Sequence, residues 1–131
     1  MSFVNALAAN NLETQVRYYA DSVDYYEFGQ VAKEVIRKDL QHDITTWPKR
    51  LYTVPEPPKF SPDGNGFIAE FPMRYSLTNP KGTIGGILQM TVRFELQGGV
   101  WQVVGIQRKV IQAARGVTSD GIEVRKAVPA H

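Results

Sequence analysis

The fold of this chain is decided by residues 18–29, which read YYADSVDYYEFG. Just before and into this stretch, Leu12, Val16 and Tyr19 recur at helical spacing and predict a helix from Leu12 to Ala20. Aromatic and β-favouring residues then follow, and they favour a short strand from Val23 to Phe28. We therefore expect a helix to give way to a strand inside this stretch.

The segment before this helix carries a helical pattern of its own. Its apolar spacing predicts a first helix over Phe3–Ala9. Asn10 or Asn11 breaks that helix and caps the next one, and Asn10 with Glu13 three residues later has the form of a capping box. Because the apolar pattern already runs at Phe3 with no lead-in, we expect a domain excised from a longer protein, or a mature product.

A second amphipathic helix is predicted from Val31 to Thr46. Its apolar residues share one stripe at helical spacing: Ile36, Leu40, Ile44 and Trp47. Pro48 ends the helix, because a proline disfavours helical backbone in the residue before it.

Strands dominate the rest of the chain. Alternation and turn residues predict a strand at Arg50–Val54, a turn over residues 61–66, and three long strands at Phe67–Leu77, Thr83–Leu96 and Val100–Ile111. Short turns join the long strands, so these pair antiparallel, and the order of helices before sheet predicts an α+β fold. We expect one domain over residues 1–112. Residues 113–131 are expected to form a tail, either an edge strand over Ile122–Val128 or a disordered segment.

Composition excludes several classes of function. The formal charge is only +2 and the basic residues are scattered, which argues against a nucleic-acid partner. The absence of cysteine excludes disulfides and thiolate metal sites. No apolar run has the roughly 18–20 residues that span a bilayer. We expect no cofactor.

Three groups of residues resemble one superfamily. They are the junction Tyr19-Ala20-Asp21 with Val23-Asp24-Tyr25-Tyr26, the pair Trp47-Pro48, and the last-strand run GVWQVV at residues 99–104. Together with the element order they resemble the NTF2-like superfamily (the cystatin-like α+β cone), and in particular uncharacterised bacterial NTF2-like and SnoaL-like domains. The resemblance implies N-terminal helices packed on the concave face of a curved antiparallel sheet. It also implies either a pocket carboxylate in a small enzyme or a catalytically silent module.

In members that resemble ketosteroid isomerase, an acid at the end of the first short strand is the general base. Counted from Ala20-Asp21, the resemblance implies Glu27 for that role, with Asp24 as the other possibility. The neighbouring aromatic side chains would raise the pKa of such a carboxylate by excluding water. On a short strand, however, Asp24 and Glu27 lie on opposite faces, so at least one of them is expected to be solvated.

A pocket is expected inside the cone. The predicted lining is aromatic with one acid at the rim of the second helix: Tyr19, Tyr25, Tyr26, Asp43, Trp47, Tyr52, Phe71 and Tyr75. His42 projects away from the apolar stripe and His131 is the last residue, so no histidine-based metal site is expected.

The faces of the long strands differ in polarity. One face is apolar, and the other carries mixed residues: Ile68, Glu70, Pro72, Arg74 and Ser76, then Ile87, Gln89, Thr91 and Arg93, then Gln102, Val104, Ile106 and Arg108. This outer face suits a symmetric homodimer. We expect a non-catalytic accessory domain that dimerises and binds a small apolar ligand. The alternative is a small cofactor-free isomerase, dehydratase or hydrolase.

Overall fold

The computed structural model describes residues 11–112. Two α-helices and a 3-10 helix are present in this part of the chain: α2 (Leu12–Val16), α3 (Lys33–Thr46) and η1 (Tyr26–Phe28). The strands are β1 (Tyr19–Tyr25), β2 (Gln30–Ala32), β3 (Lys49–Thr53), β4 (Lys59–Asp63), β5 (Gly66–Asn79), β6 (Gly82–Gln97) and β7 (Val100–Gln112). The predicted α+β class is confirmed.

All seven strands form one curved sheet in the order β2-β1-β7-β6-β5-β3, with β4 also paired to β5. The three long strands β5, β6 and β7 pair antiparallel, as predicted, whereas β1 runs parallel to β7. β3 pairs with Arg74–Thr78 of β5 and β4 pairs with Gly66–Glu70. Pro72 falls between these two registers, so neither β3 nor β4 pairs with it, and its register partner is Gln89 of β6.

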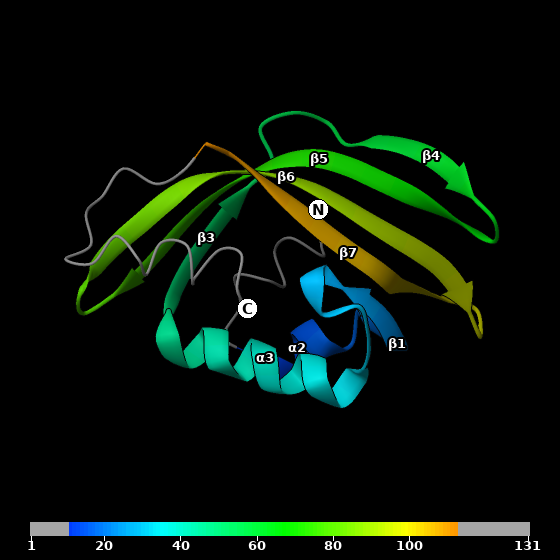
Figure 1. Cartoon of the computed structure of the whole chain (residues 1–131), viewed down its shortest axis with the longest axis horizontal. Coiled ribbons are helices and arrows are strands. Elements are labelled where there is room, and N and C mark those ends of the chain that lie inside the picture. The colour runs from blue at the N-terminus through cyan, green and yellow to red at the C-terminus, as the bar shows by residue number, and fades with distance from the viewer. Residues whose placement is uncertain (1–10, 113–131) are drawn as a thin grey trace.

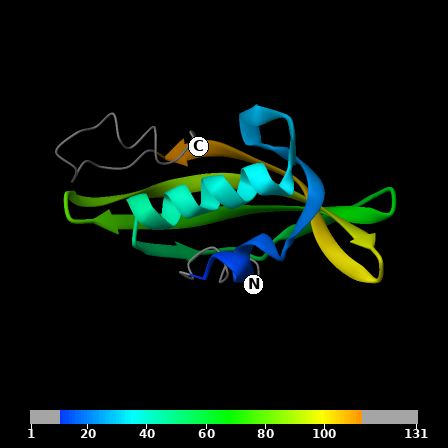
Figure 2. The same cartoon turned by 90° about the horizontal axis from the view of Figure 1, so that it is seen from below.

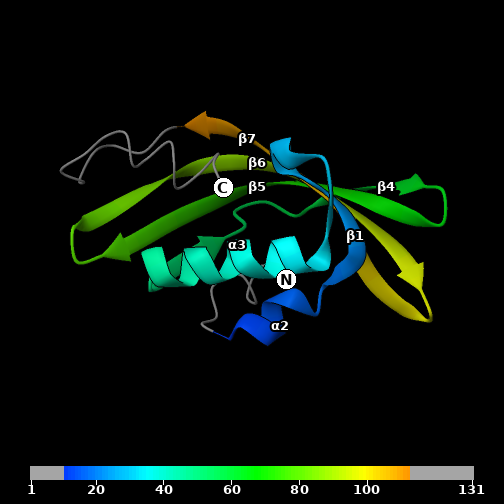
Figure 3. The same cartoon turned by 60° about the horizontal axis from the view of Figure 1, so that its bottom comes forward.

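The helices cover the concave face of the sheet (Figure 1). Seen from below, α3 lies over the sheet and runs roughly along its long strands (Figure 2), and α2 lies beside α3 on the same side (Figure 3). Ile36 and Leu40 of α3 are buried against this face. Alternate residues of β5 and β6 supply many of the other core residues, including Ala69, Phe71, Met73, Ile84, Met90 and Val92.

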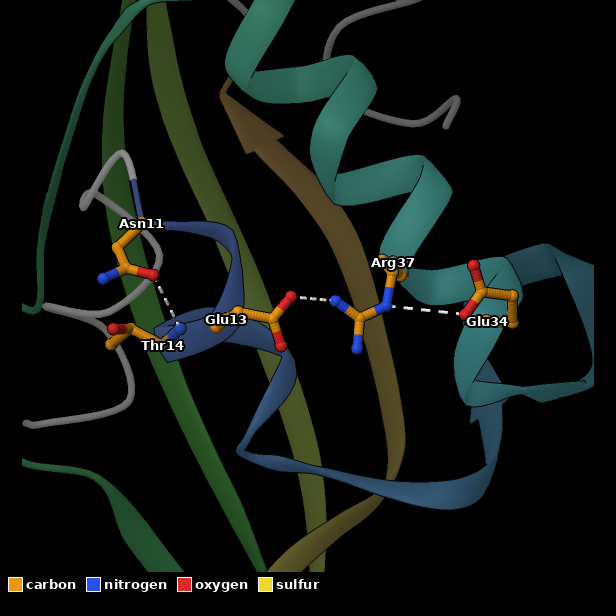
Figure 4. A network of polar contacts seen from close by, with 5 residues as sticks. All are labelled: Asn11, Glu13, Thr14, Glu34 and Arg37. Carbon is orange, nitrogen blue, oxygen red and sulfur yellow. Dashed lines mark hydrogen bonds and ion pairs between the residues drawn. The ribbon is translucent and has the colours of Figure 1, made fainter.

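Surface polar contacts cap α2 and join it to α3 (Figure 4). The Asn11 side chain caps α2 by accepting a hydrogen bond from the Thr14 backbone N–H at 3.2 Å. Glu13 pairs with Arg37 of α3, which also contacts Glu34 at 3.4 Å. The paired side chains are solvent-exposed, so the contact is screened by salt and fixes orientation more than stability.

The predicted boundary between helix and strand is wrong by several residues. The helix ends at Val16 instead of Ala20, and the strand occupies Tyr19–Tyr25 instead of Val23–Phe28. The reason is pairing with the sheet: the Val103 N–H donates to the Tyr18 carbonyl at 2.7 Å, and this draws the chain into the extended state. Tyr26, at a φ of +50°, then ends the strand.

Two further local predictions are wrong. The second helix begins at Lys33, because residues 30–32 pair with β1 as β2. The turn predicted over residues 61–66 lies partly in β4, an edge strand that contains Pro62. Proline is tolerated at a sheet edge, where its missing N–H faces no neighbouring strand.

A bulge changes the face assignment along β7. Val103 pairs with Phe94 and Gly105 pairs with Arg93, so Val104 is an additional residue. The alternation shifts there, and the prediction that Ile106 and Arg108 lie on the outer face is wrong. Ile106 is fully buried, and Arg108 lines a cavity on the concave side.

The predicted helix at Phe3–Ala9, the capping role of Asn10 and the tail at residues 113–131 lie outside the described residues. Within residues 11–112, no helix combines the length and apolarity needed to cross a membrane.

Candidate functional site

A small cavity lies between the helices and the concave face of the sheet. Its volume is about 50 Å³. It is lined by three groups of side chains: Gln15, Leu40 and Asp43 from the helices; Tyr19, Tyr25 and Tyr26 from β1 and η1; and Arg50, Tyr52, Met73, Tyr75, Leu77, Leu88, Met90 and Arg108 from β3, β5, β6 and β7. The lining is therefore rich in tyrosine and arginine, with an apolar floor.

The tyrosines form a packed cluster. The rings of Tyr19 and Tyr25 meet edge to face at 6.2 Å between centroids, and those of Tyr25 and Tyr26 at 4.6 Å. The Tyr25 hydroxyl donates a hydrogen bond of 2.5 Å to Asp39 Oδ2 on α3. This bond joins the end of β1 to the helix and helps to fix one wall of the cavity.

Burial keeps these hydroxyls protonated. Desolvation raises the pKa of Tyr26 to about 12, even though the nearby Arg108 lowers it. Burial likewise raises the pKa of Tyr19, Tyr25 and Tyr52, with a further increase from the charges of Asp39 or Asp43. At neutral pH the tyrosines can therefore donate hydrogen bonds.

Tyr26 and Arg108 face each other. The Arg108 Cζ lies 3.8 Å from the centroid of the Tyr26 ring, a cation–π geometry. Gln107 Nε2 donates to the Tyr26 carbonyl at 3.1 Å and so holds the short helix η1 against β7. The guanidinium plane is thereby fixed by a ring on one side.

Three buried donors in the cavity lining have no hydrogen-bond partner within residues 11–112. They are Arg108 Nε, Arg108 Nη2 and Tyr75 Oη. Arg50 differs, because its Nη1 donates to the Trp47 carbonyl at 2.9 Å. Unpaired buried donors are costly, and their usual explanation is a ligand or ordered water.

The structure brings six of the eight predicted pocket residues into the lining: Tyr19, Tyr25, Tyr26, Asp43, Tyr52 and Tyr75. Trp47 and Phe71 are buried but do not line the cavity. Trp47 lies at the end of α3, and Phe71 lies nearer the start of β5 than Met73 and Tyr75.

The two predicted catalytic acids lie outside the cavity. Glu27 is exposed, because it belongs to η1, where the left-handed backbone of Tyr26 ends the strand. Asp24 is half-buried in β1 and does not line the cavity. The predicted placement assumed a strand that continued to Phe28, and that strand ends at Tyr25.

Sequence reasoning did not identify Gln15, Arg50 or Arg108 as lining residues. For Arg108 the available signal was Gly105, because a glycine inside a strand often marks a bulge. A Cβ at Gly105 would lie 3.3 Å from the Arg93 side chain, which is tight for an alanine.

The described residues contain no group of three His, Cys, Asp or Glu side chains that could hold a metal ion. His42 is exposed on α3, 3.4 Å from the Thr46 hydroxyl. His131 lies outside the described residues.

Comparisons with known proteins identify the architecture. No family model matches the chain, and no curated protein does. Among solved structures, an NTF2-like superfamily protein from Salmonella enterica serovar Typhimurium LT2 is 14% identical over 91% of this chain and 89% of its own, with a TM-score of 0.74.

Two other similar structures differ in what is known of them. The hexachlorocyclohexane dehydrochlorinase LinA-type3 from Novosphingobium barchaimii LL02 is 10% identical over 88% of this chain and 84% of its own, with a TM-score of 0.70. An uncharacterised protein with a cystatin-like fold from Caulobacter vibrioides is 11% identical over 84% and 82%, with a TM-score of 0.70. At such identities the likeness concerns the fold alone. The chain has the NTF2-like, cystatin-like α+β fold that its junction residues indicate.

Proposed function

We propose that this chain is a non-catalytic binding domain that holds a small ligand in its cavity and acts as a homodimer. The observation that carries the proposal is the set of unpaired buried donors on Arg108 and Tyr75 in the lining. Groups of this kind are costly without a partner, and a ligand acceptor would remove that cost.

The volume of the cavity limits the size of the ligand that it can hold. Ligand pockets for drug-sized molecules measure roughly 300–1,000 Å³, whereas this cavity measures about 50 Å³. A water needs roughly 10–15 Å³ on this measure, so the ligand has only a few non-hydrogen atoms. The sequence alone predicts an apolar ligand, but the arginines and tyrosines in the lining favour one with a polar end.

The placement of the acids supports a non-catalytic role. Glu27 and Asp24 stand outside the lining. A general base must come within hydrogen-bond reach of the proton it removes, and a ligand inside the cavity is not within reach of the exposed Glu27.

The homodimer proposal rests on the outer face of the sheet. Partly exposed apolar residues are interleaved there with uncharged polar ones, for example Ile68, Ile87, Gln89 and Thr91. A groove of about 330 Å³ runs along this face beside Pro57 and Pro72. A mixed face with such relief suits a partly wet, isologous interface.

Native mass spectrometry of the purified protein tests both parts. We expect a dimer that carries a reproducible small-molecule mass, because acceptor atoms of the ligand would form hydrogen bonds with the unpaired buried donors of Arg108 and Tyr75. A monomer would rule out the interface. The binding role would be ruled out by two results together: a protein that carries no adduct, and a melting temperature that no member of a library of small polar fragments changes.

A second candidate function is supported by one observation. Asp43 lines the cavity together with Tyr26 and Tyr52, which gives a carboxylate beside hydroxyl donors. This combination suits proton abstraction with a stabilised oxyanion, the chemistry of a small isomerase or dehydratase. The test is exchange of α-protons of small ketones in D₂O, followed by NMR. Exchange that disappears in Asp43→Asn would favour the enzyme; no exchange above buffer with the wild-type protein would favour the binding domain.

A further inference from the structure

We propose that the ligand of the cavity is a small monocarboxylate, held side-on by Arg108 through its Nε and Nη2 atoms. This inference rests on the proposed binding function and names the chemical class of its ligand.

The two unpaired nitrogens lie on one edge of the guanidinium. Nε–H and one N–H of Nη2 point the same way, at the spacing of the two oxygens of a carboxylate. Both atoms are buried and have no hydrogen-bond partner within residues 11–112. A single water can accept from one of them well, whereas a carboxylate accepts from both in parallel.

The formal charge of the lining favours one negative charge on the ligand. Arg50 and Arg108 contribute two positive charges and Asp43 one negative charge, which leaves +2 − 1 = +1. Asp43 lines the same cavity and still leaves both nitrogens of Arg108 unpaired. A monoanion would complement the unpaired edge of Arg108, whereas a neutral ligand would bring no charge to it.

The position of the guanidinium is set before any ligand arrives. The Tyr26 ring covers one of its faces at 3.8 Å from Cζ, and Gln107 secures the backbone of that tyrosine. The side chain thus loses little freedom on binding, and this lowers the cost of association.

The rest of the ligand must be short and apolar. Arg108 pairs with Met90 across the sheet, and the neighbouring inward position on β6 is Leu88. Both side chains line the cavity. Its volume of about 50 Å³ accommodates a group of the size of acetate, and excludes an aromatic acid.

The test is an NMR titration of the full chain with sodium acetate, acetamide and sodium chloride at equal concentrations. The readout is the Arg108 Nε–Hε signal together with the amides of β7. We expect a saturable shift with acetate and none with acetamide or chloride. Acetamide has nearly the same shape but no charge, and chloride has charge but a single acceptor atom.

Two variants separate the bidentate contact from charge alone. Arg108→Lys keeps the charge but loses the planar edge, and we expect its acetate affinity to fall by about tenfold or more. Arg74→Lys is the matched control on the exposed outer position of β5, and its affinity should equal that of the wild type. Circular dichroism and the melting temperature establish that both variants fold.

Several outcomes would overturn the carboxylate proposal, and some of them would overturn the proposed binding function as well. Equal acetate binding by Arg108→Lys would show that a point charge suffices. A saturable shift with acetamide but not acetate would refute the carboxylate while leaving the binding domain intact. No cavity shift with acetate, acetamide or the fragment library would remove the proposed binding function as well.

Discussion

One wall of the cavity consists of tyrosine side chains whose rings pack against one another. Tyr19 and Tyr25 are almost completely buried, and the Tyr25 hydroxyl is anchored on Asp39. Ionisation of any of them would place a negative charge in a desolvated cluster that already faces Asp39 and Asp43. The folded state therefore retains these protons.

This retention predicts a loss of stability at alkaline pH. The pKa of Tyr26 rises from 10.0 to about 12 on folding, so above pH 10 the unfolded chain releases a proton that the folded chain keeps. The unfolded state then binds fewer protons, and the free energy of unfolding falls as pH rises from 10 to 12. Below pH 10 the contribution is fully present.

Urea unfolding at a series of pH values, with tyrosinate absorbance as a second probe, measures this fall. Tyr26→Phe removes the titrating hydroxyl, and its stability should decline less steeply over the same range. Identical slopes for the wild type and Tyr26→Phe would contradict the assignment.

At this scale the sequence pointed to most of the tyrosines in the lining and to Asp43, but not to the two arginines. Large aromatic residues at inward strand positions have few alternatives to the interior of a cone, so Tyr75 could be placed from the alternation along its strand. Tyr19 is predicted on a helix but lies in β1. The burial of Arg108 depends instead on the extra residue Val104, which no residue-by-residue alternation anticipates.

At the scale of elements, the long strands could be predicted from their own sequence, whereas the short strands depend on the strands they pair with. Alternation located β5, β6 and β7 because each buries one face. The start of β1 and the existence of β4 depend on partners distant in the chain, namely Val103 and β5. Tertiary pairing overrides the local pattern in both places.

The backbones of β5 and β6 approach each other closely at Gly66, and this gives a prediction for its substitution. A Cβ at Gly66 would stand 1.7 Å from the Phe94 carbonyl oxygen, so Gly66→Ala must separate the two strands. We expect a loss of about 3 kcal/mol or more, at or beyond the upper end of overpacking costs.

Gly64 is the matched control in the preceding turn. Its φ is +56° and no atom lies within 4 Å of the position that an added Cβ would take, so Gly64→Ala carries only the left-handed backbone penalty. That penalty is roughly 1–2 kcal/mol. Urea unfolding of both variants gives the comparison, and equal losses would mean that the strands separate without cost.

At the scale of the whole molecule, the proposed ligand site and the proposed interface lie on opposite faces of the sheet. The concave face carries the helices and the cavity, while the convex face carries the groove and the mixed residues of the proposed interface. A change on the convex face should therefore alter assembly without altering the cavity.

Thr91→Lys tests this separation. In an isologous dimer a central residue meets its own copy or a near neighbour, so two added lysines repel each other. We expect the dimer dissociation constant to rise by about tenfold or more, as for roughly 1.4 kcal/mol. Analytical ultracentrifugation over a range of concentrations measures it.

Thr45→Lys provides the comparison, because it adds the same charge at an exposed site on α3. Its dimerisation should match that of the wild type, and both variants should keep the Arg108 Nε–Hε signal of the wild type. Equal weakening by the two substitutions would point to net charge instead of the convex face.

The extra residue at Val104 has a consequence for comparing this chain with its relatives. A homologue that lacks the bulge would keep the same inward arginine one position earlier in its sequence. An alignment that forbids gaps within strands would then match Arg108 to a residue from the opposite face. Conservation of the cavity along the last strand is therefore visible only when a one-residue gap is opened at that point.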